Sequence, residues 1–188
     1  MKGVYFMRII AGEAGGRKLK TRKTKSVRPT QDRIKEAIFS MLISYIKNSK
    51  VLDLFAGFGS LGLEAVSRGA YHTTFVEINK KNASIISENI SLCNFEKYTN
   101  LVIDDVFSFL KNNKNKYDLI FMDPPYEKNL NDKVIKNILK LPSTIKDEGL
   151  IIVEHSKKEK VNGTDKLKVI KNRNYGNTTI TILKYREE

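Results

Sequence analysis

The residues best suited to chemistry are Asp123, Pro124, Pro125 and Tyr126, which follow the apolar, β-prone run at 117–122. The run predicts a buried strand, and the prolines predict a stiff turn because each fixes φ and removes one backbone donor. The carbonyls of Asp123 and Pro124 then lie outside any strand pairing, beside a carboxylate and a flat ring. This corner suits a planar group that carries an NH2, so we interpret all four residues as catalytic. A strand-ending turn with a surface tyrosine is the alternative.

A glycine loop indicates a second functional site. Gly57, Gly59 and Gly62 form the pattern G-x-G-x-x-G after a predicted strand, and Glu77 follows about 20 residues later, as in dinucleotide-binding loops. Asp53 lies where a pyrophosphate would have to sit, and its carboxylate repels phosphate but attracts a sulfonium and an ammonium group. The loop therefore favours S-adenosylmethionine (SAM) over NAD. Glu77 is predicted to bind the ribose diol, with a surface ion pair as the alternative.

Further residues near these strand ends complete the predicted cofactor site. Asp105 is placed to accept a hydrogen bond from the adenine amino group, and the neighbouring Asp104 could do the same. The predicted site also includes Phe55, Ile78 and Val106, which adjoin these residues in the chain.

The order of the predicted elements determines the fold class. Apolar runs bounded by turn residues alternate with helical patterns, which predicts right-handed crossovers and a parallel sheet. The first helix is expected to begin at an N-cap on Thr30 and to carry one apolar stripe from Ile34 to Ile46. The other expected helices are at 61–68, after 79, at 106–110 and after 131, and the expected strands are at 50–54, 73–77, 101–103, 117–122 and 150–154.

The chain's end departs from this alternation. The segments 167–170 and 178–183 predict an antiparallel hairpin at the sheet edge. We therefore expect a Rossmann-like α/β fold of the class I methyltransferase kind, with a mixed seven-stranded sheet, a parallel core and helices on both faces. Ligands of such sheets bind beyond the carboxyl ends of the strands, where the acids named above are expected.

Positive charge is concentrated near the N-terminus. Residues 1–28 contribute +8 of the net charge of +13, and the other 160 residues contribute the rest. A cluster of this kind indicates a polyanionic partner, most simply a nucleic acid. We divide the chain into a basic hairpin or arm at 1–28 and a catalytic domain at 29–188. The predicted RNA-binding residues are Arg8, Arg17, Lys18, Lys20, Arg22, Lys23 and Arg28.

Composition argues against several other classes of protein. Cys93 is the only cysteine, so an intramolecular disulfide is excluded, and with His72 and His155 as the only histidines a metal site is not expected. No apolar run approaches the roughly 18 residues of a membrane span, and the first residues lack the apolar core of a signal peptide. We expect a cytoplasmic monomer without a membrane or metal partner, in which His155 is structural.

Taken together, the motifs resemble a known family. The segments MRIIAGEAGGRKL, RPTQDRIKEAIFSML, VLDLFAGFGSLGLEAVSRGA, MDPPY and GLIIVEHSKK are similar to the bacterial 16S rRNA (guanine-N2)-methyltransferases of the RsmD type. The resemblance implies methyl transfer from SAM, leaving S-adenosylhomocysteine, to N2 of one guanine, conventionally numbered 966. It implies that 16S rRNA or the small ribosomal subunit is the partner. It also implies that Asp123 to Tyr126 hold the base.

Three other functions would each fit a part of this sequence. A DNA or RNA adenine-N6 methyltransferase shares the Asp-Pro-Pro-Tyr pattern, but a DNA enzyme normally needs a target-recognition region for which this chain has no room. An NAD-dependent Rossmann oxidoreductase would fit the glycine loop alone. A non-catalytic RNA-binding protein on the same fold would fit the basic arm.

Overall fold

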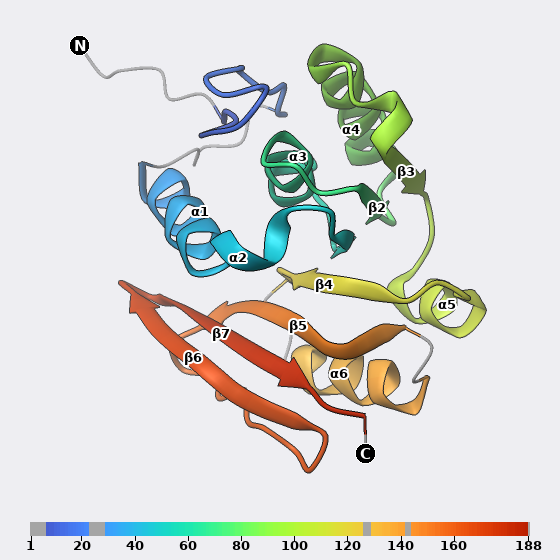
Figure 1. Cartoon of the computed structure of the whole chain (residues 1–188). Coiled ribbons are helices and arrows are strands. Elements are labelled where there is room, and N and C mark those ends of the chain that lie inside the picture. Colours follow the sequence, from blue (N-terminus) through green and yellow to red (C-terminus); the bar gives the residue numbers. More distant parts are fainter. Residues whose placement is uncertain (1–6, 23–28, 126–128, 142–143, 188) are drawn as a thin grey trace.

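A computed structural model describes residues 7–22, 29–125, 129–141 and 144–187. One seven-stranded sheet runs through it in the order β3-β2-β1-β4-β5-β7-β6 (Figure 1). Strands β1 to β5 pair in parallel, and the last two strands pair antiparallel at one edge. The strands are β1 Lys50–Leu54, β2 His72–Val76, β3 Thr99–Val102, β4 Tyr117–Met122, β5 Ile145–Ser156, β6 Leu167–Tyr175 and β7 Thr178–Tyr185.

Helices connect the parallel strands and cover both faces of the sheet. They are α1 Pro29–Met41, α2 Ile43–Ile46, α3 Ser60–Ser67, α4 Lys80–Cys93, α5 Val106–Asn112 and α6 Leu130–Lys140, with a short 3-10 turn at Glu96–Tyr98. The predicted mixed sheet with a parallel core and a C-terminal hairpin is confirmed. Among the described residues, no helix has both the length and the apolar character needed to cross a membrane.

The alternation of side chains along the strands produces a separate core on each face. On one face, Leu52 and Ile120 pack with α5 and α6. On the other face, Val51 and Phe121 pack with α1, α2 and α3. Successive strand residues point to opposite faces, so Val51, Leu119 and Phe121 face α1 and α3, whereas Tyr117, which precedes the irregularity in the pairing of β4 with β5, packs in the other core. This parity decides which strand-end side chains lie together.

The first predicted helix is wrong in two details. The stripe that predicted one helix to Ile46 is divided between α1 and α2, with Leu42 between them. Thr30 lies inside the first turn of α1, which begins at Pro29, so it does not occupy the N-cap position. The side chain of Tyr45 is 40% exposed although it belongs to the predicted stripe. At the break Tyr45 turns outward while Ile46 stays buried in the core, which a strict helical period does not anticipate.

Strand β5 is longer than the apolar run predicted. It begins at Ile145, before Gly149, and its pairing with β4 shifts register near Leu119. Glu148 adopts a left-handed φ of 63° at this irregularity. The residues between Ile145 and Gly149 are polar, so a prediction based on apolar runs does not detect the first part of this strand.

The N-terminal segment packs on the domain. Its chain turns back on itself with one isolated antiparallel bridge between Arg8 and Lys18, within the range predicted as a basic hairpin or arm. Ile9 and Leu19 are buried in a third cluster with residues of α3, β2 and α4. Figure 1 shows this segment lying over α3. The basic segment is therefore part of the protein core as well as of its surface.

Candidate active site

Four acids lie at the carboxyl ends of four adjacent strands, on the same face of the sheet. Asp53 belongs to β1, Glu77 follows β2, Asp123 follows β4 and Glu154 lies near the end of β5. Asp53 pairs in register with Phe121, so Asp123 falls two positions farther along the same face. The same parity places Glu77 and Glu154 on that face. The sequence prediction that acids gather at this edge is confirmed by the strand register.

Burial raises the pKa of three carboxyl groups in this site, those of Asp53, Asp123 and Glu154. Asp53 is 3% exposed, and desolvation raises its pKa to about 7, against the lowering effect of the Gly62 N–H. Asp123 presents much of its surface to the open pocket, but protein atoms crowd its carboxyl group and desolvation raises its pKa to about 6. Burial, followed by the charge of Asp123, raises the pKa of Glu154 to about 8. The site therefore attracts cations and N–H donors.

The glycine loop has the geometry that a close ligand contact needs. Gly57 and Gly59 have φ of 59° and 82°, in the left-handed region where a side chain adds strain. Gly62 serves a different purpose, because a Cβ there would lie 2.2 Å from the ring of Phe75. The glycines thus turn the loop back over β1 and let α3 pack closely on β2.

Two acids hold this loop in place. Glu77 accepts hydrogen bonds from Gly57 N at 2.8 Å and from Asn79 N at 2.7 Å, one on each carboxylate oxygen. Asp53 accepts a hydrogen bond from Gly62 N at 2.9 Å. Each oxygen keeps a second lone pair, so these bonds orient the carboxylates without using up their capacity to bind a ligand. The ribose contact of Glu77 stays a prediction.

Residues after β2 and β3 form an apolar border. Ile78 is 67% exposed and Ile103 is 52% exposed, and Val76 pairs with Val102 just before them. Ile103 was not predicted as a site residue, although it follows a strand as Ile78 does. Large exposed aliphatic side chains at adjacent strand ends suit the faces of a planar base.

The remaining predicted cofactor residues are Asp105, Val106 and Phe55, and the structure shows how each of them contributes to the fold. Asp105 is the N-cap of α5, where one oxygen accepts from Phe107 N at 2.9 Å, while Asp104 accepts from the Asp105 N–H at 2.8 Å. Val106 is buried in the core, and Phe55 is partly buried with a left-handed φ of 63°. The predicted adenine contact and the other two cofactor contacts remain untested by this geometry.

The Asp-Pro-Pro turn borders a cleft of about 100 Å³. Pro124 is buried and Pro125 is exposed, while Tyr126 falls outside the described residues. The cleft is lined by Met7, Gln31, Asp32, Ile34, Lys35, Ile38, Ser60, Leu61, Asp123 and Glu154. It thus joins the end of β4 to the start of α3 and to α1, and a residue of the N-terminal segment also reaches it.

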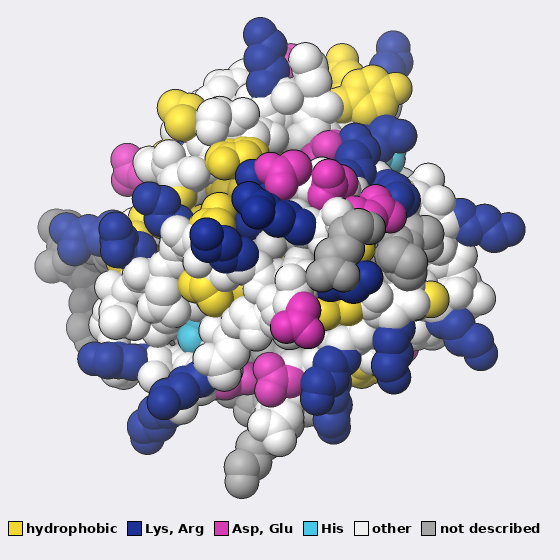
Figure 2. Space-filling model, turned by 60° about the horizontal axis from the view of Figure 1, so that its bottom comes forward, with side chains coloured by type: hydrophobic (Ala, Val, Ile, Leu, Met, Phe, Trp, Pro, Cys, Tyr) yellow, Lys and Arg dark blue, Asp and Glu magenta, His cyan; other side chains and the backbone are white. Residues whose placement is uncertain are grey.

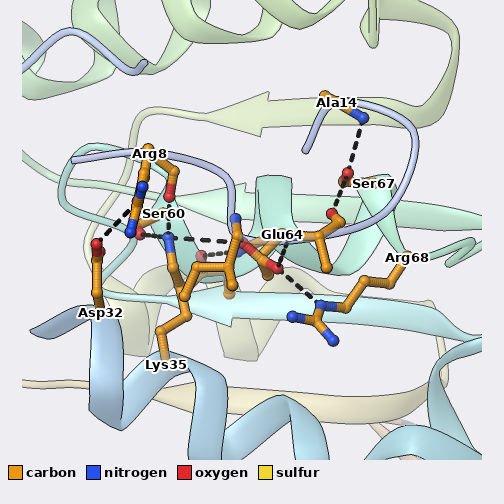
Figure 3. Close-up of polar contacts among 12 residues, drawn as sticks. Arg8, Ala14, Asp32, Lys35, Ser60, Glu64, Ser67 and Arg68 are labelled. Atoms are coloured by element: carbon orange, nitrogen blue, oxygen red, sulfur yellow. Dashed lines mark hydrogen bonds and ion pairs between the residues drawn. The ribbon is translucent and has the colours of Figure 1, made fainter. Parts of the chain in front are cut away.

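A buried ionic cluster attaches the N-terminal segment to α3 (Figure 3). Glu64 is fully buried and accepts from Ile10 N at 2.7 Å, from Ala11 N at 3.1 Å and from Arg68 Nε at 2.7 Å. The ammonium of Lys35 lies 3.6 Å from Glu64, and burial lowers the pKa of Lys35 against the opposing effect of Glu64. Sequence reasoning missed this cluster. An acid among apolar helix residues is its only signal in the sequence.

Asn89 of α4 connects the N-terminal segment with the glycine loop. Its carboxamide oxygen accepts from Lys20 N at 2.7 Å, and its Nδ2 donates to the Lys20 and Phe58 carbonyls, both at 3.0 Å. The side chain is fully buried. One residue therefore sets the position of the basic segment relative to the predicted cofactor loop.

The predicted RNA-binding residues are partly engaged in surface contacts. Arg8 pairs with Asp32, Lys20 pairs with Glu88, and Arg17 donates to the Leu92 carbonyl. Such exposed pairs are weak and exchange easily with a phosphate.

The structure describes two of the other four predicted RNA-binding residues. Lys18 and Arg22 are exposed, whereas Lys23 and Arg28 fall outside the described residues. On the face drawn in Figure 2, Lys and Arg side chains are spread over the surface with acids between them.

The predictions for His155 and for a metal site concern side chains away from the cleft and the glycine loop. The His155 ring is buried, with Nε2 at 2.9 Å from Thr181 Oγ1 and Nδ1 at 3.0 Å from the Ser156 carbonyl. These contacts support the structural role predicted for it. Within the described ranges, His, Cys, Asp and Glu form no group of three or more suited to hold a metal ion.

Comparisons with known proteins agree with this geometry. The family model described as "Conserved hypothetical protein 95" matches residues 7–184. The chain is 40% identical over 154 residues to ribosomal RNA small subunit methyltransferase D of Buchnera aphidicola, covering 81% of this chain and 80% of that protein.

Solved structures extend the likeness to the fold. A structure assigned to a methyltransferase of Escherichia coli superposes with a TM-score of 0.86 at 26% identity, covering 97% of this chain and 99% of that one. A structure assigned to a SAM-dependent methyltransferase of Streptococcus mutans has a TM-score of 0.68 at 19% identity, covering 84% of this chain and 49% of that one. At this identity, the second likeness concerns the fold alone.

Proposed function

The chain belongs to the family of ribosomal RNA small subunit methyltransferase D, and we propose that it transfers a methyl group from SAM to N2 of one guanine in 16S rRNA. The observation that carries this proposal is the register of β1 and β4. Asp53 at the glycine loop and Asp123 at the Asp-Pro-Pro turn lie at the ends of neighbouring strands. A cationic methyl donor and an amino group would therefore meet at one sheet edge.

The residues present fit SAM as the methyl donor. Asp53 and Glu77 supply negative charge beside the loop, and the exposed Ile78 and Ile103 supply apolar contact for adenine. A dinucleotide fits less well, because the Asp53 carboxylate would face its phosphates. When bound, SAM supplies an electrophilic methyl group and leaves as S-adenosylhomocysteine.

The residues of the turn would activate the acceptor by hydrogen bonding. The Asp123 carboxylate and the Pro124 carbonyl each accept a hydrogen bond from one of the two N2 hydrogens. These bonds favour a pyramidal nitrogen with its lone pair directed at the methyl group. These bonds strengthen as positive charge develops on nitrogen, so they stabilise the transition state more than the ground state. The released proton passes to Asp123 or to water. We propose that Tyr126 stacks on the base.

The basic segment would bind the phosphate backbone, which adds affinity without sequence information. We propose that residues 1–28 contact RNA and that residues 29–188 carry the methyl transfer, in a cytoplasmic monomer. In this proposal guanine 966 is the target and the small ribosomal subunit is the partner. Asn89 then holds the RNA-binding segment at a fixed distance from the cofactor loop.

The test is methyl transfer from labelled SAM to small-subunit particles that lack the modification, with mass spectrometry to locate the methyl group. Asp123→Ala should lower the rate by about 100-fold or more, because it removes one transition-state partner. Asp165→Ala, at an exposed position, is the matched control. Methylation of adenine, stabilisation by NAD but not by SAM, or full activity of Asp123→Ala would each contradict the proposal.

A further inference from the structure

Besides Asp123, the cleft is lined by the carboxyl groups of Asp32, which is paired with Arg8, and of Glu154, for which the proposed chemistry has no role. Glu154 lies on β5, the strand next to β4, and both Asp123 and Glu154 line the cleft. Phe121 pairs with Ile152 and Met122 pairs with Val153, so the next position along the two strands places Asp123 opposite Glu154. The two acids occupy the same face by parity. They form adjacent acceptors on one side of the cleft.

The walls of the cleft suit a flat ring. Ile34 and Ile38 of α1 and Leu61 of α3 line it, and Ile34 and Ile38 belong to the buried core. Such walls exclude water from the polar edge of a ligand and so strengthen its hydrogen bonds with the acids. The cleft thus offers apolar sides and an acidic end.

Lys35, the basic residue that lines the cleft, already interacts with other groups of the protein. Lys35 donates to the Arg8 carbonyl and to Ser60 Oγ at 3.0 Å, and it lies 3.6 Å from Glu64. Its three hydrogens therefore have protein partners. In contrast, no hydrogen bond or ion pair within the described part of the chain engages the carboxyl group of Glu154. The polar groups left for a ligand at this end are acceptors.

Only one nucleobase matches a row of acceptors. Guanine carries N–H hydrogens on both N1 and N2, which are neighbours on one edge, whereas adenine and cytosine carry a lone pair beside their amino group. An acceptor facing that lone pair loses a hydrogen bond and adds repulsion. Adjacent carboxyl groups therefore complement guanine and oppose the other amino-bearing bases.

We propose that Glu154 selects guanine by accepting a hydrogen bond from its N1–H while Asp123 accepts from its N2 amino group. The inference rests on the proposed function and adds to it a residue that determines which base is accepted. Glu154 contacts the edge of the base beside the reacting nitrogen, and takes no part in the transfer itself. Desolvation and Asp123 already raise the pKa of Glu154, and N–H donors from a base would offset the repulsion between the two acids.

The test compares RNA with guanine and RNA with 2-aminopurine at the target position. Both bases carry the N2 amino group, but 2-aminopurine has a lone pair on N1. A protonated Glu154 could donate to that lone pair, so the rates are measured at about pH 8.5, above the pKa of about 8. The wild-type protein should prefer guanine by about 10-fold to 100-fold in kcat/KM, the discrimination expected of a good base contact.

Glu154→Gln should reduce this preference by about 10-fold, because its amide can turn its NH2 toward N1 of 2-aminopurine. Asp147→Asn, an exposed change on the same strand, should keep the wild-type preference. A purely structural role would lower both rates and leave their ratio unchanged.

Four results would overturn the inference. The first is equal wild-type rates on the two bases, which needs no variant. The second is an unchanged preference in Glu154→Gln, and the third is a change in the KM for SAM alone, which would place Glu154 in the cofactor site. Absence of guanine methylation by the wild-type protein would overturn the proposed function as well, so the two failures are distinguishable.

Discussion

Replacement of the buried Asp53 by Asn should stabilise the free protein and weaken its binding of SAM. Burial raises the pKa of this carboxyl group to about 7 in the folded protein, from an ordinary value of 3.8. A folded-state pKa that is raised for an acid lowers stability as pH rises, because the unfolded chain ionises first. Asn keeps an oxygen for the Gly62 N–H but removes the charge. The gain should therefore grow between about pH 4 and pH 8.

The size of the effect follows from the difference between a pKa of about 7 and the ordinary value of 3.8, because each tenfold change in proton affinity is worth about 1.4 kcal/mol. Asp53→Asn should raise the free energy of unfolding by about 4 kcal/mol near pH 8.5 and by less than about 1 kcal/mol near pH 4. Urea titrations of the ligand-free protein at both pH values measure this difference. Calorimetry with SAM at neutral pH should show that the affinity falls, because the cationic donor loses a counter-charge.

The control for this experiment is Asp165→Asn, at an exposed position, where stability should change by no more than about 0.5 kcal/mol at either pH. A gain of equal size at both pH values would refute the electrostatic explanation. Unchanged affinity for SAM would refute the role of Asp53 in attracting the donor.

Three further substitutions test the framework of the site by urea denaturation. Glu64→Gln should cost about 3 kcal/mol because it leaves buried cations without their counter-charge, and a loss below about 1 kcal/mol would contradict this. Gly62→Ala should cost about 1–3 kcal/mol, since its Cβ would clash with a neighbouring ring, and a neutral effect would show that α3 can shift. Asn89→Ala should cost about 2 kcal/mol and increase protease cleavage in the N-terminal segment; equal losses in the partly exposed control Asn137→Ala would argue against a specific clamp.

The sequence predicted the sheet and the strand-end acids because both depend on local patterns. Apolar runs such as 117–122 are long enough to mark buried strands, and Asp53 and Asp123 lie at or just after the ends of two such runs. The helix expected after 79 begins with an N-cap on Asn79, whose side chain accepts from Lys81 N and Asn82 N. Such features need only neighbouring residues to form.

Features that depend on distant partners were not predictable. Glu64 reads as an ordinary acid until its contacts with the N-terminal backbone and Lys35 are known. The division between α1 and α2 and the early start of β5 at Ile145 are likewise set by packing, which overrides the local pattern. The role of Glu154 depends on strand register, because only pairing with β4 brings it beside Asp123.

The attachment of the N-terminal segment has a consequence for the order of folding during synthesis. Ala14 bonds to Ser67, 53 residues later, and Lys20 bonds to Asn89, 69 residues later. Chains are made from the N-terminus, so this segment leaves the ribosome well before the helices that receive it. The segment cannot form these hydrogen bonds until α3 and α4 have emerged. Completion of the proposed RNA-binding surface should therefore be among the later steps in the maturation of the nascent chain.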